Sequence, residues 1–130
     1  MMISDPGKAA PEHWRTGVET RMIVSAANGA SELCIFEQWI EPGAGAPTHS
    51  HQVEEVLTVR AGQAEIWLED ERMTLSAGQS VIVPARKHHG FRNSGDATLH
   101  LYAVLAAPVF EALAEGAAEM TRRWQTSSAA

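Results

Sequence analysis

Residues 43–62 read GAGAPTHSHQVEEVLTVRAG, and this segment carries the strongest pattern in the chain. His49 and His51 are two positions apart, so on a β-strand both side chains point to the same side. Farther along, Glu55 shares its parity with the apolar residue Leu57, which predicts that its carboxylate faces inward, unlike that of Glu54. A lone charge in an apolar interior is costly unless it is paired or bound to a metal. The segment therefore predicts a polar cluster inside a β-structure.

The geometry of this segment requires a bend. A straight strand would place the Cα atoms of His49 and Glu55 roughly 20 Å apart. The chain must therefore turn after His51, with Glu55 opening the next strand. A second histidine pair, His88 and His89, supplies a further imidazole. Imidazoles and carboxylates bind transition ions at about 2 Å, so these residues are candidate metal ligands.

The rest of the chain predicts an all-β domain. Short β-rich runs alternate with turn-forming segments such as Asn28-Gly29 and Ser94-Gly95, as is typical of an antiparallel sandwich or barrel. No space remains between them for the crossover helices of a parallel sheet. The predicted strands are Arg21–Ser25, Leu33–Ile40, Val53–Arg60, Ala64–Glu69, Met73–Leu75, Ser80–Val83, His89–Asn93 and Thr98–Leu105.

The C-terminal segment predicts a different element. Pro108 suits the first turn of a helix, and apolar residues then recur at spacings of three and four. We expect one amphipathic α-helix over about residues 108–124, packed on the barrel or against a partner subunit. Residues 1–130 would form a single domain with its barrel at about 20–106. The apolar stripe consists of Phe110, Leu113, Ala117, Met120 and Trp124.

Composition narrows the classes of function. A chain of 130 residues with 45% hydrophobic residues fits one domain. Its formal charge of −6 would repel a phosphate backbone, so we expect no nucleic-acid partner. Cys34 is the only cysteine, which favours the reducing cytoplasm, and no leader or long apolar run suggests export or membrane insertion.

Two spaced motifs resemble those of the cupin superfamily, and of its small, single-domain members in particular. The first is Gly43, five residues, His49, one residue, His51, three residues, Glu55, six residues, Gly62. The second is Gly78, five residues, Pro84, four residues, His89, three residues, Asn93, with Arg86 standing where the family pattern has a glycine. The resemblance implies a jelly-roll barrel of two antiparallel sheets, followed here by the C-terminal α-helix.

The resemblance also implies a metal centre. Its ligands would be His49, His51, Glu55 and His89, with His88 pointing outward, and they would hold one divalent ion of Fe, Mn, Ni, Co or Zn per chain. We expect a metal-dependent enzyme acting on a small organic substrate, first of all an oxidoreductase of the dioxygenase kind. Glu55 is the catalytic candidate.

Other functions stay open at this point. They are a non-catalytic small-molecule binder or sensor, and a metal-dependent lyase, isomerase or cyclase. Small cupins commonly form homodimers, so we expect one here. An anionic substrate could bind to Arg86 and Lys87, which precede His89, and Tyr102 could orient a ligand. Surface and packing roles are more usual for such residues.

Overall fold

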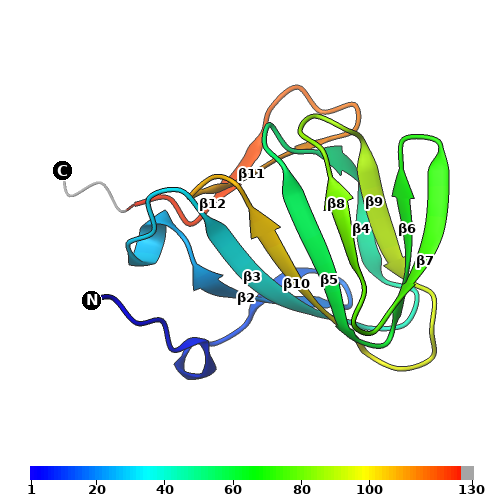
Figure 1. Ribbon diagram of the computed structural model, residues 1–130, viewed down its shortest axis with the longest axis horizontal. Coiled ribbons are helices and arrows are strands. Elements are labelled where there is room, and N and C mark those ends of the chain that lie inside the picture. The colour runs from blue at the N-terminus through cyan, green and yellow to red at the C-terminus, as the bar shows by residue number, and fades with distance from the viewer. Residues whose placement is uncertain (127–130) are drawn as a thin grey trace.

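The computed structural model of the chain describes residues 1–126, which form two six-stranded antiparallel sheets (Figure 1). In the first sheet the order is β1 (Glu12–Arg15), β2 (Val18–Val24), β3 (Cys34–Ile40), β10 (Leu99–Leu105), β5 (Glu55–Ala61) and β8 (Ser80–Val83). In the second it is β12 (Thr121–Arg123), β11 (Phe110–Ala114), β4 (Gly45–Ser50), β9 (His89–Asn93), β6 (Gln63–Leu68) and β7 (Glu71–Ser76). Two short 3-10 helices, η1 (Pro6–Lys8) and η2 (Ala26–Asn28), lie near the N-terminus.

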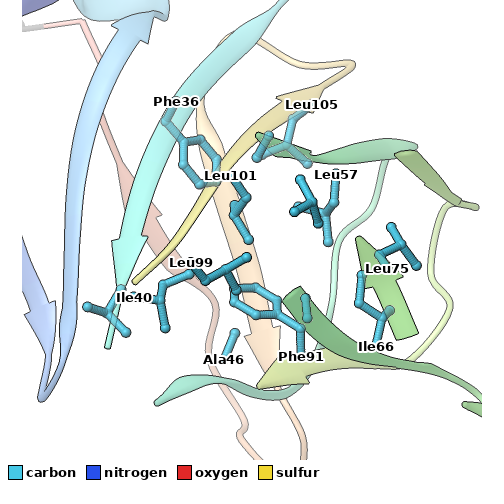
Figure 2. Close-up of a cluster of buried hydrophobic side chains, with 14 of the residues drawn as sticks. Phe36, Ile40, Ala46, Leu57, Ile66, Leu75, Phe91, Leu99, Leu101 and Leu105 are labelled. Atoms are coloured by element: carbon cyan, nitrogen blue, oxygen red, sulfur yellow. The ribbon is translucent and has the colours of Figure 1, made fainter. Parts of the chain in front are cut away.

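The core lies between the two sheets. Strand β10 illustrates how a strand contributes to this core. Its residues alternate between buried and half-buried along its whole length, as expected for a strand with one face on a core. Side chains from both sheets converge on the same interior, as Figure 2 shows for Phe36 and Leu101 from one sheet and Phe91 and Ile66 from the other. The predicted all-β fold of two antiparallel sheets is thus confirmed.

The predicted C-terminal α-helix is wrong. Residues 108–124 instead form the hairpin β11–β12, and no α-helix occurs among residues 1–126. The free edge of β4 explains the difference, because it offers unpaired backbone groups that β11 satisfies, with Leu113 opposite Ser50. Between the two strands Gly116 adopts a φ of +80°, which favours glycine and turns the chain back.

The aromatic residues of the predicted helical stripe also pack together in this hairpin. Phe110 stands opposite Arg123 across the hairpin, so Phe110 and Trp124 come together with ring centroids 6.0 Å apart. Both also approach Trp14, which precedes Arg15 in β1 on the other sheet. The edge strands β1 and β12 therefore meet on one side of the barrel. Both lie outside residues 20–106, so strands continue beyond the predicted bounds of the barrel. Residues 127–130 of the predicted domain lie outside the described residues.

Within residues 1–126, no helix combines the length and the apolar character needed to cross a membrane.

Candidate metal centre

Four residues predicted as metal ligands come together inside the barrel. His49, His51, Glu55 and His89 each offer a ligand atom, and these atoms all lie within 4.8 Å of one another. Two ligands on opposite sides of one ion, each about 2.1 Å away, are about 4.2 Å apart. The group therefore needs only small adjustments to surround a single ion.

Strands from both sheets position the group. His49 lies near the end of β4 and pairs in register with His89, which begins β9 in the same sheet. His51 follows β4 directly, and the chain then bends so that Glu55 opens β5 in the opposite sheet. The Arg86 backbone N–H donates to the His51 carbonyl oxygen at 2.7 Å and ties this bend to the loop before β9. The bend predicted between His51 and Glu55 is confirmed.

Each imidazole is oriented by a backbone carbonyl. The Nδ1 atoms of His49, His51 and His89 lie 2.8, 2.6 and 2.9 Å from the carbonyl oxygens of Pro47, Glu111 and Lys87, respectively. A carbonyl oxygen can only accept, so each Nδ1 donates its hydrogen. In a neutral ring this leaves the Nε2 lone pair free, which is the tautomer that a metal-binding histidine uses.

Glu55 is a fully buried carboxylate with only 3% of its surface exposed. Its Oε1 atom lies 3.1 Å from His89 Nε2 and 3.4 Å from His51 Nε2. Burial alone would raise the pKa of this carboxyl, but hydrogen bonding and attraction to the two histidines outweigh burial and lower the pKa to about 2. Glu55 is thus held as an anion throughout the neutral range.

The histidines themselves differ in their electrostatics. Burial, together with the neighbouring rings of His89 and His51, lowers the pKa of His49 to about 4. Burial also disfavours a charge on His51, but the Glu55 carboxylate and the Glu111 carbonyl prevail and raise the pKa of His51. At neutral pH His49 is therefore a neutral imidazole with a free lone pair, as a metal ligand must be.

The donor set fits a divalent transition ion. Metal binding requires neutral rings, in which three Nε2 lone pairs and one carboxylate would face the ion with no hydrogen between them. The buried Nε2 atom of His51 has no hydrogen-bond partner, although buried polar atoms almost always have one. A cation satisfies all four groups together. Imidazole with carboxylate suits Fe, Mn, Ni, Co or Zn and does not choose among them.

Other candidates from the sequence lie away from this group. His88 is exposed, as predicted, and so are Arg86 and Lys87. None of the three lines the cavity whose walls include His49, His51 and Glu55. Arg86 has a φ of +69°, so the chain keeps a left-handed turn here even without the glycine of the family pattern. Tyr102 is half-buried on β10 beneath Arg60 and does not line the cavity either.

A cavity of about 160 Å³ is lined by His49, His51 and Glu55 of this group and by residues of β1 and β12. Its walls include the aromatic residues Phe36, Phe91 and Phe110. Two cationic residues, Arg15 and Arg123, also line it. Sequence reasoning missed both arginines, since they lie outside the two motifs, and Arg123 fell within the supposed helix. Only the recognition of β1 and β12 as strands could have pointed to them.

Two curated proteins are related in sequence to most of this chain. The HTH-type transcriptional regulator SutR of Escherichia coli is 28% identical over 110 residues, which make up 82% of this chain and 62% of the regulator. This chain thus spans less than two thirds of the regulator's length. Protein SchB of Streptomyces halstedii is 31% identical over 93 residues, 70% of this chain and 67% of SchB.

Solved structures share the fold at low sequence identity. An RmlC-like cupin from Shewanella frigidimarina has a TM-score of 0.71 at 23% identity, covering 82% of this chain and 89% of that one. The polyketide cyclase RemF from Streptomyces resistomycificus has a TM-score of 0.71 at 21% identity, covering 81% and 78%. Oxalate decarboxylase from Bacillus subtilis, a protein with Mn(II) centres, has a TM-score of 0.76 at 18% identity, covering 84% and 30%. These likenesses concern the fold alone.

Comparison of the sequence with models of protein families shows the family of this chain. The model for the cupin domain matches residues 36–105, more than half of the chain and the whole stretch that carries the four candidate ligands. The two sheets, the inward-facing ligand group and this match agree, and the chain belongs to the cupin family.

Proposed function

We propose that this chain is a metal-dependent enzyme that acts on a small organic molecule bound in its barrel. One divalent transition ion would be held by His49, His51, Glu55 and His89. The observation that supports this proposal is the convergence of four candidate ligands, three of which (His49, His51 and Glu55) line a cavity with room for a ligand. Four protein ligands leave about two of the roughly six coordination positions of such an ion free.

The bound ion would supply Lewis-acid or redox chemistry at the inner end of the cavity. The residues of the chain would do the rest. Three histidines, fixed by backbone carbonyls, keep the geometry rigid, and the aromatic walls exclude water from the reacting atoms. Our proposal gives Glu55 a catalytic role as well: after loosening from the ion, its carboxylate accepts a proton from the substrate.

For the reaction class we propose an oxidoreductase of the dioxygenase kind. Such a reaction needs space for an organic substrate and for O₂ side by side, and an ion held by these four residues would leave about two coordination positions for them beside the apolar wall. With iron as the ion, the donor set of histidines and one carboxylate suits redox chemistry with O₂.

A second candidate is a metal-dependent lyase, isomerase or cyclase. It is favoured by the fold likeness to a polyketide cyclase and to oxalate decarboxylase, whose names are those of a cyclase and a decarboxylase. A third candidate, a binder or sensor without turnover, is favoured by the relationship to a transcriptional regulator. Fold does not fix reaction, so these candidates are separated by experiment.

The test is anaerobic reconstitution of the full chain with Fe(II), Mn(II), Ni(II), Co(II) or Zn(II) separately, followed by O₂-uptake assays with small aromatic diols, diketones and thiols. We expect O₂ uptake with the iron form of the wild type and none with the His51→Ala variant. Product formation without O₂ uptake would favour the lyase or cyclase class. Failure of every ion to bind the wild type would overturn the enzyme proposal.

The remaining expectations are also proposals. A homodimer would elute in light-scattering chromatography at twice the chain mass of 14.1 kDa, and a mass equal to one chain would refute it. A cytoplasmic location follows only from the single cysteine and stays a prediction.

A further inference from the structure

The outer end of the cavity carries two arginines that the proposed metal chemistry does not use. Arg15 belongs to β1, the edge strand of one sheet, and Arg123 to β12, the edge strand of the other. The rings of Trp14 and Trp124 meet between these edges at 5.4 Å. Both arginines line the same cavity as His49 and Glu55.

Neither arginine is neutralised within residues 1–126. Arg15 Nη1 donates to the Gly45 carbonyl oxygen at 2.9 Å, and the Arg123 guanidinium stacks on the Trp14 ring, 4.1 Å from its centroid. Among these residues neither forms an ion pair with a carboxylate, whereas the more exposed Arg122 pairs with Glu111 at 2.8 Å. The Nε atom of Arg123 is buried and has no hydrogen-bond partner. A half-buried cation without an anion is costly, and two in one cavity need an explanation.

The two charges also act on each other. Burial, and then the positive charge of Arg123, lower the pKa of Arg15, and both guanidinium groups belong to residues that line one cavity. A divalent ion at the inner end would add further positive charge, which the single carboxylate of Glu55 offsets only in part. The cavity as a whole therefore attracts an anion. Guanidinium groups bind carboxylate and phosphate oxygens strongly because two parallel N–H groups can donate at once.

The walls and the volume limit the size of that anion. Phe36 and Phe110 both line the cavity, and their ring centroids lie 5.6 Å apart. Planar apolar groups pack well on such walls. The cavity volume of about 160 Å³ is below the roughly 300 to 1,000 Å³ of sites for drug-sized ligands, so the ligand is small.

We propose that the cavity takes a small organic anion with an apolar, preferably aromatic, body, whose carboxylate or phosphate group pairs with Arg15 and Arg123. The inference rests on the proposed function, because the other end of the same molecule would face the metal centre. The proposed anion-binding residues are thus the two arginines of the terminal strands, and not the exposed Arg86 and Lys87.

The test compares ligands that share a body and differ in charge. Benzoate, phenyl phosphate and the neutral benzamide are titrated calorimetrically into the Zn(II)-loaded full chain and into the metal-free chain. The variants are Arg15→Gln with Arg123→Gln, the charge-preserving pair Arg15→Lys with Arg123→Lys, and Arg72→Gln as the matched control. Arg72 is 66% exposed and stacks on Trp67, which does not line the cavity. Metal content and thermal midpoint are measured on every sample.

We expect at least one of the two anions to bind the wild type about tenfold or more tightly than benzamide. This preference should vanish in the double glutamine variant, survive in part in the double lysine variant and stay unchanged in Arg72→Gln. Whichever of benzoate and phenyl phosphate binds more tightly shows whether the cavity prefers a carboxylate or a phosphate group. If neither anion binds the wild type better than benzamide, the inference is overturned.

Two further outcomes separate the inference from the proposed function. An anion preference that persists in the double glutamine variant would show that the metal alone recognises the charge, which overturns the inference but leaves the metal centre in place. A wild type that binds no zinc yet prefers the anion through Arg15 and Arg123 would support the inference and remove the metal-dependent function.

Discussion

The two ends of the cavity are built differently. At the inner end the four candidate ligands come from β4, β5 and β9, which have a neighbouring strand on each side, and every imidazole is held by a backbone carbonyl. At the outer end Arg15 and Arg123 come from the edge strands β1 and β12 and are only half-buried. The candidate metal ligands thus lie where neighbouring strands and backbone hydrogen bonds constrain the chain most. The arginines proposed to bind an anion lie on edge strands, which have a neighbour on one side only.

The largest expected effect tests the inner end. His89→Ala removes a buried imidazole and should weaken binding of the divalent ion by more than about 100-fold, since groups that merely support ligands already contribute about 10- to 100-fold. The adjacent His88→Ala is the matched control, because His88 is exposed, and should bind the ion like the wild type. Metal titration of both variants measures the difference. An equal loss of metal binding in the two variants would contradict the choice of His89 over His88 as the ligand.

A second prediction concerns the stability that the terminal hairpin provides. Phe110 is 7% exposed and packs against Trp14, Phe36 and Trp124. Phe110→Ala should lower the free energy of unfolding by roughly 3 to 5 kcal/mol, as large cavities in a core do. Glu115→Ala, in the exposed turn of the same hairpin, should change it by less than about 0.5 kcal/mol. Urea unfolding of the metal-free chains provides the comparison, and a small effect of Phe110→Ala would show that the outer end is not part of the core.

A third prediction addresses the link between the two ends. Gly45 on β4 accepts the hydrogen bond of Arg15, and a Cβ at this position would overlap the backbone carbonyl of Phe91 on β9. Gly45→Ala should therefore separate β4 from β9 and destabilise the chain by about 1 to 3 kcal/mol. Gly95→Ala, where a Cβ meets only atoms at ordinary contact distance, is the control. Thermal unfolding of the two variants tests the expectation, which fails if both behave like the wild type.

The smallest expected effect is at Arg86. Its left-handed backbone, with φ at +69°, is unfavourable for any residue with a Cβ. Arg86→Gly should relieve this strain and raise stability by up to about 1 kcal/mol, less the entropy that glycine loses on folding. Metal and anion affinities should both stay unchanged, because Arg86 is exposed and does not line the cavity. Weaker binding of a carboxylate by this variant would instead give Arg86 a part in recognition.

Prediction from sequence succeeded where pattern and physics were specific. The spacing of His49 and His51 and the inward parity of Glu55 identified a group that the fold brings together, because a strand alternates its faces strictly. Spacing also separated His89 from His88, and the exposure of His88 agrees with that choice.

Prediction failed where one pattern fits two structures. Spacings of three and four between Phe110 and Trp124 suit a helix, but a hairpin that folds back on itself brings the same residues together. The choice depended on the open edge of β4, which is a tertiary feature that no local pattern contains. Arg15 and Arg123 were missed for the same reason, since they lie 108 positions apart in the chain and line one cavity only once both sheets are complete.

The central claim is that one divalent ion binds at the three histidines and Glu55. The most direct measurement is the stoichiometry of metal bound after anaerobic reconstitution and removal of free ion, made in parallel on the wild type and on Glu55→Gln, which keeps the shape of the side chain but removes its charge. We expect close to one ion per chain in the wild type and a large loss in the variant. An absence of bound Fe, Mn, Ni, Co and Zn in the wild type, or equal metal in both proteins, would contradict it.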